Sequence, residues 1–97
     1  MIVRADLPKG LQAAQVVHAA GESSPGNLPE GTYAVVLTVP DEAAMMAVAA
    51  RLLRAKVPFT PIFEPDPPYQ GALMAIGVRP ARKEALKRHL SSLPLLK

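Results

Sequence analysis

The residues best suited to bind a ligand lie on one short stretch near the start of the chain. Gln12, Gln15 and His18 recur every three residues, and Glu22 follows four residues later. In a helix this spacing keeps Gln15, His18 and Glu22 on one side. Ligand sites in open α/β sheets tend to lie just past a strand end, where this helix is predicted to begin. The alternative reading makes His18 a partly exposed spacer or a hydrogen-bonded packing residue without a functional role.

The opposite side of this helix is predicted to pack on the protein core. Its small and apolar side chains are Ala13, Val16, Val17 and Ala20. We expect a first strand over residues 2–7, a break at Pro8-Lys9-Gly10, and a helix from about Leu11 to Ala20. Gly21 is predicted to end the helix.

A second candidate for a positioned site is the loop over residues 64–71, which carries the carboxylates Glu64 and Asp66. Its three prolines fix backbone angles and restrict their neighbours, so the loop is expected to be stiff. A stiff loop at a strand end is a good place to hold reactive groups. The same composition also fits an ordinary structural turn, and the sequence leaves both readings open.

The remaining pattern predicts a single α/β domain over residues 1–97. Residues 31–39 read as a central strand buried on both faces, and Asp41 is predicted to cap a helix with a core-facing stripe. Residues 57–63 contain two prolines and read as an edge strand, followed by a strand over residues 72–78 and a helix after Arg79-Pro80. The order β-α-β-α-β-β-α predicts a three-layer α/β/α fold with a four-stranded mixed sheet.

Composition excludes several function classes. The chain has no cysteine, so it has neither disulfides nor thiolate metal sites, and its two histidines are far apart in sequence. We expect no metal ion and no other cofactor. The longest apolar run is far shorter than the ~20 residues that span a bilayer, so we expect no membrane segment and a cytoplasmic location.

The charge is modestly basic, with a formal net charge of +3, which permits a polyanionic partner without requiring one. Positive side chains are densest around the last predicted helix, at Arg79, Arg82, Lys83, Lys87 and Arg88. These residues are either a solvated helix face or a surface that contacts phosphates.

Three segments together form a pattern that carries a resemblance. Residues 3–7 read Val-Arg-Ala-Asp-Leu, Gly10 follows, and residues 13–19 read Ala-Ala-Gln-Val-Val-His-Ala. Val-Pro-Phe precedes a strand ending at Glu64, and Ala-Ile-Gly at residues 75–77 precedes a helix with His-Leu and a closing Leu-Pro-Leu-Leu. In order and spacing the chain resembles the type 2 peptidyl-tRNA hydrolase family, which has Arg-x-Asp-Leu at a strand end and Ala-Ala-Gln-x-x-His-Ala on a helix.

The resemblance implies a mixed four-stranded sheet flanked by helices and cleavage of the ester between a peptide and tRNA. It implies a catalytic group of His18, Lys9 and Glu64, with Gln15 orienting them. His18 matches the family's helix histidine, and an imidazole near neutral pH suits proton transfer or holding water. The tRNA-binding residues that we expect are Arg4, Arg79, Arg82, Lys83 and Arg88.

The chain departs from the family's pattern at four places, one of which is the segment between Asp6 and Gly10, shorter than the family's by about two residues. Leu11 stands where the family has a lysine, Pro65-Asp66 replaces the Ala-Gly that follows the family's acid, and Ala72 replaces a threonine. These differences support an alternative function, a catalytically inactive binding module that recognises RNA, a nucleotide or a protein. A further alternative is an interaction protein that forms a homodimer through its edge strand or through the helix with Met45-Met46.

Overall fold

A four-stranded mixed sheet forms the centre of the computed structural model, which describes residues 1–97. The strands lie in the order β2 (Leu37–Val39), β1 (Ile2–Arg4), β4 (Ala72–Val78) and β3 (Phe59–Glu64). β1 and β2 are parallel, whereas β4 is antiparallel to both of its neighbours, β1 and β3. The predicted α/β fold with its element order β-α-β-α-β-β-α is confirmed.

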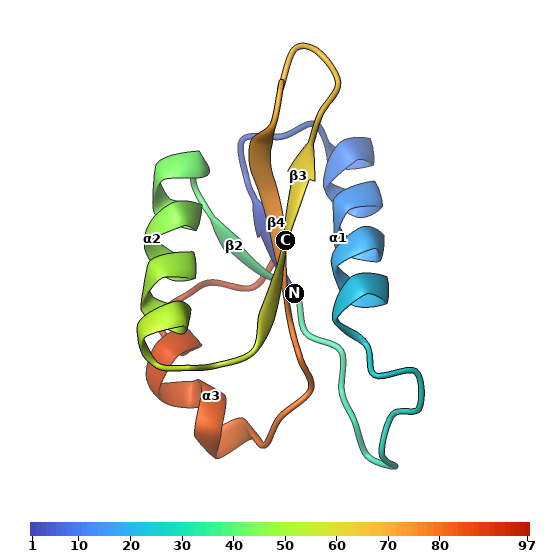
Figure 1. Cartoon of the computed structure of the whole chain (residues 1–97), viewed down its shortest axis with the longest axis vertical. Helices are drawn as coiled ribbons and strands as arrows, with labels where there is room; N and C mark the ends of the chain where they lie inside the picture. Colours follow the sequence, from blue (N-terminus) through green and yellow to red (C-terminus); the bar gives the residue numbers. More distant parts are fainter.

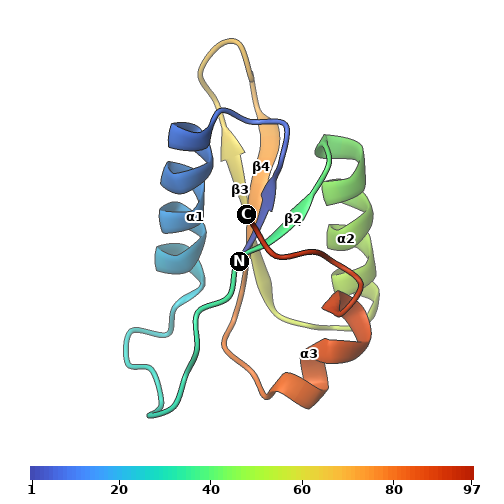
Figure 2. The same ribbon diagram turned by 180° about the vertical axis from the view of Figure 1, so that it is seen from behind.

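Helices cover both faces of this sheet (Figures 1 and 2). α1 (Lys9–Ser23) lies on one face, and α2 (Glu42–Arg54) and α3 (Lys83–Leu90) lie on the other. Two apolar clusters fill the two spaces between the layers, one on the α1 side and one on the α2 and α3 side. None of the three helices has the length and the apolar run needed to cross a membrane.

β4 is the most buried strand, and its bounds are those predicted from sequence. Leu73 and Ile76 join the cluster beneath α2, while Met74 and Ala75 join the cluster beneath α1. A strand with covered faces on both sides needs a continuous apolar run, which residues 72–78 supply. β3 is an edge strand, as its prolines predicted.

The strand predicted over residues 31–39 is wrong in length and in place. Only Leu37–Val39 forms β2, which lies at the edge of the sheet and not at its centre, and Tyr33 is 88% exposed. Beyond β1, the partner of this segment is the C-terminal stretch, because the Thr38 amide donates to Pro94 O at 2.8 Å. β-branched and aromatic residues indicate that a segment fits a pleated sheet, but they do not indicate which segment it pairs with.

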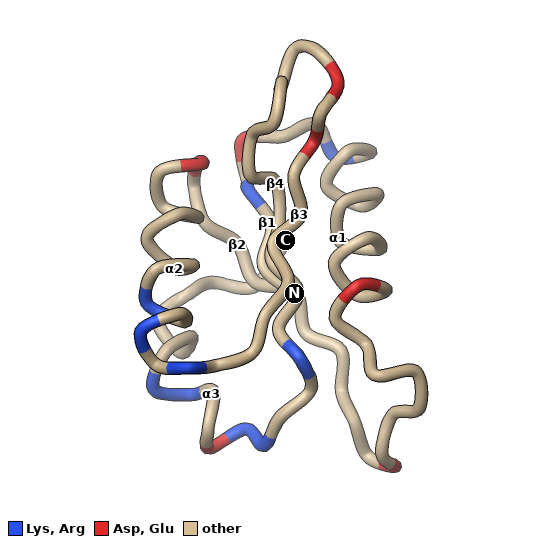
Figure 3. Tube along the Cα trace, in the orientation of Figure 1, with Lys and Arg blue, Asp and Glu red and all other residues tan.

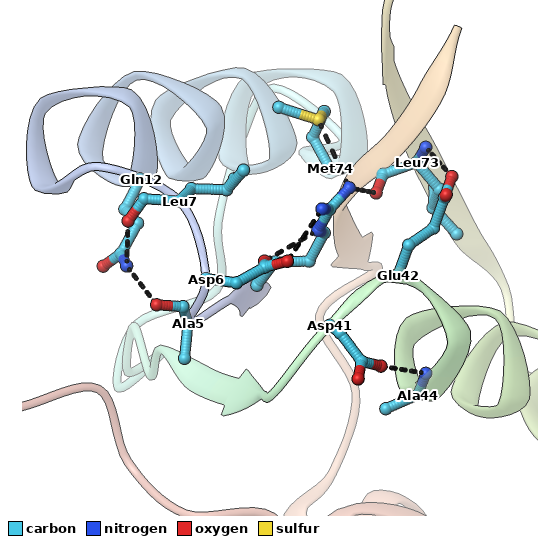
Figure 4. A network of polar contacts seen from close by, with 10 residues as sticks. Ala5, Asp6, Leu7, Gln12, Asp41, Glu42, Ala44, Leu73 and Met74 are labelled. Carbon is cyan, nitrogen blue, oxygen red and sulfur yellow. Dashed lines mark hydrogen bonds and ion pairs between the residues drawn. The ribbon is translucent and has the colours of Figure 1, made fainter. Parts of the chain in front are cut away.

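α1 packs on the sheet through its amide side, which corrects the prediction from the apolar pattern. Gln12, Gln15 and Ala19 are buried, whereas Val17 is 72% exposed on the outer surface. Burying a glutamine is tolerated when its amide is hydrogen-bonded. The Gln12 amide meets this condition by donating to the carbonyls of two residues between β1 and α1, at 2.8 and 3.2 Å (Figure 4).

Two residues were predicted to mark helix ends, and the structure confirms one of these predictions and not the other. Asp41 caps α2 as predicted, and its side chain accepts a hydrogen bond from the Ala44 amide at 2.9 Å (Figure 4). Gly21 does not end α1, because the helix continues to Ser23. An exposed glycine inside a helix costs only about 1 kcal/mol relative to alanine, which neighbouring turns can outweigh.

A glycine on β4 sets how closely α1 approaches the sheet. A Cβ at Gly77 would fall on the carbonyl oxygen of Ala19 and within 2.8 Å of the Ser23 side chain. At Gly21, in contrast, a Cβ would meet no atom within 4 Å.

Two matched substitutions test this packing. Gly77→Ala is expected to lower the free energy of unfolding by about 1–3 kcal/mol, because the helix backbone must move away from β4. Gly21→Ala is expected to raise it by about 0.5–1 kcal/mol, because alanine favours the helical backbone. Urea unfolding of both variants measures the two signs, and a neutral Gly77→Ala would contradict the close approach.

Candidate functional site

Arg4, Lys9 and Glu64 lie at one end of the molecule, which we call the hairpin end, and Gln15 and His18 follow along α1. The hairpin end comprises residues 4–9 after β1, residues 40–42 before α2 and the β3–β4 hairpin over residues 64–71. In Figure 1 it is the upper end, where the parallel strands β1 and β2 finish and the helices α1 and α2 begin. This is the edge of an α/β sheet at which ligands usually bind.

The clearest contact at the hairpin end joins Gln15 and Glu64, which are 49 residues apart in the chain. The Gln15 side chain is 3% exposed, and its Nε2 donates to Glu64 Oε2 at 3.2 Å. The other carboxylate oxygen, Oε1, accepts from the Asp66 amide at 3.2 Å. Glu64 is therefore a half-buried carboxylate with both of its oxygens held in place by N–H donors.

One polar atom of this contact has no partner. Gln15 Oε1 is buried and accepts no hydrogen bond. An acceptor buried without a donor costs roughly 1–3 kcal/mol. Gln15 Oε1 is closed off from solvent, so the acceptor of this pair that a ligand can reach is the half-buried Glu64 carboxylate.

The two remaining residues of the predicted catalytic group stand beside this contact without touching it. His18 follows Gln15 by one turn of α1 and is exposed, and Lys9 is the exposed first residue of the same helix. Neither side chain makes a hydrogen bond or an ion pair. The structure thus brings Gln15 and Glu64 together and leaves His18 and Lys9 free on the surface of α1. Leu11, at the place of the family's lysine, packs on the α1-side core.

Arg4 is held inside the fold by an ion pair. Its Nε and Nη2 donate to the two carboxylate oxygens of Asp6, both at 2.9 Å, and its Nη1 donates to Leu73 O at 3.2 Å. The hydrogen bond to Asp6 raises the pKa of Arg4, and the hydrogen bond from Arg4 lowers the pKa of Asp6. Arg4 therefore fastens β1 to β4 and is not part of a free basic surface.

Glu42 completes this network on the α2 side. Its Oε2 accepts from the Leu73 amide at 2.7 Å, so β4 is tied to α2 as well as to β1 (Figure 4). The sequence analysis assigned no site role to Asp6 or Glu42. A signal for Asp6 was present, because residues two apart in an extended chain point the same way and Asp6 follows Arg4 by two.

The other predicted basic residues lie at the opposite end of the molecule, which we call the basic end (residues 51–56 and 79–88). Arg79, Arg82, Lys83 and Arg88 are all exposed. Figure 3 shows most Lys and Arg residues at this end, near the C-terminal end of α2 and around α3, where Glu84 also lies, and most of the acidic residues at the hairpin end. The longest dimension of the molecule is 38 Å, which bounds the separation of the two groups.

The two best-defined hollows of the molecule lie away from Gln15 and Glu64. They have volumes of about 420 and 330 Å³, lie on the α2 side of the sheet, and are lined by neither Gln15, His18 nor Glu64. Small-molecule sites are usually concave and enclose most of their ligand. A site outside these hollows is better suited to the end of a large ligand that is held by contacts elsewhere.

No protein-family model matches the chain, and no curated protein matches its sequence. No three His, Asp or Glu side chains are grouped so that they could hold a metal ion.

The ion pair of Arg4 and Asp6 predicts a pH-dependent part of the stability. The folded state lowers the pKa of Asp6, so the contribution is fully present above the unfolded value of about 3.9 and is lost as the pH falls through the folded value. Asp6→Asn should be less stable than the wild type at neutral pH, and the difference should shrink below about pH 3.9.

Urea unfolding from neutral pH to strongly acidic pH measures this difference. Asp66→Asn is the control, because the Asp66 side chain is exposed and makes no ion pair. A constant difference between wild type and Asp6→Asn over the whole range would contradict this role of the pair.

Proposed function

We propose that this protein is peptidyl-tRNA hydrolase-like and acts on the ester between a peptide and the terminal ribose of tRNA, with Gln15, Glu64 and His18 at the reacting centre. The observation that carries the proposal is the hydrogen bond between Gln15 and Glu64. It joins the two segments in which the resemblance expects catalytic residues, although those segments are far apart in the chain.

The geometry supplies the groups that ester hydrolysis needs. Glu64 is a half-buried carboxylate that can accept a proton from water, and the Gln15 amide holds it in place. The water oxygen bonds to the ester carbonyl carbon and the bond from that carbon to the ribose oxygen breaks. His18, one turn along α1, donates a proton to the leaving ribose oxygen when it is in its protonated form. Glu64 then loses the proton that it took from water to the solvent, and His18 regains one from the solvent, so that both groups return to their starting states.

Charge that develops on the carbonyl oxygen needs a donor. The first turn of α1 has no side-chain cap and no acidic residue, so its free N–H groups and the Lys9 ammonium make this helix end positive. In the proposal, the donor to this oxygen is the ammonium of Lys9, whose backbone begins α1 six residues before Gln15. Donors of this kind are commonly worth 10²–10³-fold in rate.

The charge distribution supports a large anionic substrate. The basic end has exposed cations from α3, while the hairpin end carries the candidate reacting groups. In the proposal, phosphates of the acceptor stem contact the basic end and the single-stranded 3′ end reaches Glu64. Phosphate contacts would then supply most of the affinity, and the surface around Glu64 would need to hold only the reacting bond.

A second candidate is a binding module on the same fold that has lost the chemistry. Two observations favour it: Leu11 packs on the core where the family has a lysine, and the guanidinium of Arg4 is paired with Asp6. No cation therefore touches the Gln15–Glu64 pair. This candidate predicts binding of tRNA that weakens with salt, without turnover.

Release of the peptide from N-blocked aminoacyl-tRNA tests the reaction. Glu64→Gln and His18→Ala should each lower kcat/KM by at least about 10²-fold, since positioned acid–base groups contribute 10²–10⁴-fold. His89→Ala on α3 and Glu30→Gln in the exposed loop after α1 are controls of the same residue types, and they should leave the rate unchanged. Turnover that is insensitive to Glu64→Gln would contradict the proposed centre, and tRNA binding without turnover would favour the binding module.

The salt dependence of tRNA binding tests the basic end separately. Arg82→Gln and Arg88→Gln should each reduce the slope of log K against log salt by about one, with equal effects on charged and uncharged tRNA. Glu84→Gln on the same helix removes no cation and should not reduce the slope. Unchanged slopes in both arginine variants would remove the basic end from the tRNA contact surface.

A further inference from the structure

The α2 side of the sheet leaves β3 without a covering helix. α2 packs on β4, β1 and β2, whereas α1 on the other face packs on β3 as well as on β4 and β1. The uncovered side of β3 carries Phe59, Pro61 and Phe63, and Phe63 is 56% exposed. Large aromatic side chains on an open sheet face are unusual for a surface that only meets water.

The flank of α2 that faces β3 is apolar as well. Met46, which is 58% exposed, and Leu53 lie two turns apart on the same side of the helix, with Ala49 between them. Together the two elements form a hollow of about 330 Å³, which we call the β3–α2 groove. Its apolar lining consists of Met46, Ala49, Phe59, Pro61, Phe63 and Leu73.

Charges of opposite sign stand at the two ends of this groove. At the hairpin end, Glu42 lines the groove and Asp66 follows the end of β3. At the other end, Arg54 and Lys56 follow the groove's helix, and the Arg79 amide bonds to the carbonyl of the residue before β3. The groove is thus apolar along its length, acidic at one end and basic at the other.

We propose that the β3–α2 groove binds a second copy of this chain in an antiparallel, twofold-symmetric dimer. A twofold axis through the middle of the groove places the acidic end of each copy against the basic end of the other, and it buries Phe63 and Met46 of both copies. Another protein would need a matching pattern of charge, whereas a second copy has it by symmetry. This inference does not rest on the proposed hydrolase function.

Side chains, not backbone pairing, would form the contact. Pro61 within β3 and the prolines on either side, Pro58 and Pro65, remove amide donors from this edge of the sheet, which disfavours strand addition. The groove is about 20 Å long, which is the span of six strand residues, and roughly 20 Å wide, which is the width of a strand beside a helix. About 400 Å² per copy, or about 800 Å² in total, is below the roughly 1,000 Å² expected of a stable interface, so we expect a weak, transient dimer that forms at high protein concentration.

Sedimentation equilibrium of the full chain, from low to high micromolar concentration, tests the proposal. The wild-type mass should rise with concentration from 10.3 kDa towards twice that value. Phe63→Asp and Met46→Asp should each raise the dimer dissociation constant at least tenfold, and both positions are exposed, so the fold should persist. Val17→Asp, on the outer surface of α1 in the opposite layer, should leave the constant unchanged.

A charge exchange tests the orientation of the two copies. Asp66→Lys alone and Arg79→Glu alone should each weaken the dimer, because each brings like charges together at both ends. The two substitutions in one chain should restore dimerisation, since the opposite signs meet again. A monomeric wild type at every concentration, a dimer insensitive to Phe63→Asp and Met46→Asp, or effects of the two charge reversals that simply add would each overturn the proposal.

Discussion

The close packing of α1 against β4 is the contact on which the rest of the molecule depends. It is allowed by the missing side chain at Gly77 and the small, fully buried side chain of Ala19. Because the helix lies so near the sheet, Gln12 and Gln15 sit at the level of the strands. From there the Gln12 amide reaches the carbonyls after β1, and the Gln15 amide reaches Glu64 at the end of β3. A bulkier contact would separate the two halves of the candidate site.

Local signals predicted the fold well, and partner choice accounts for the errors. The apolar run over residues 72–78 and the cap at Asp41 depend on neighbouring residues, and both match the structure. The strand predicted over residues 31–39 is wrong because the outer hydrogen-bond partner of this segment is the C-terminal stretch. The composition of residues 31–39 does not reveal that partner. Gln15 and Glu64 were each singled out from the sequence, but their contact spans 49 residues and follows only from the tertiary fold. The role predicted for Arg4 in tRNA binding stays a prediction, and the structure adds that its guanidinium is paired with Asp6.

Acidic and basic residues are concentrated at opposite ends of the molecule, and the two ends have different roles in the proposed function. The hairpin end holds a rigid network in which Arg4 and Asp6 neutralise each other and Glu42 ties α2 to β4. Such a network fixes the strand ends around Glu64 without adding a free cation. The basic end carries exposed cations with no acidic partner, where long-range attraction of an anion is strongest. The same polarity makes two antiparallel copies complementary.

The most direct test of the central claim is an NMR titration with a short 3′-terminal RNA that carries an amide-linked amino acid, which mimics the ester and resists hydrolysis. The account predicts the largest shifts at the Gln15 side-chain amide, the Asp66 backbone amide and the His18 ring, and their loss in Glu64→Gln. Shifts confined to the α2 face, or no shifts at any concentration, would contradict a site built on Gln15 and Glu64.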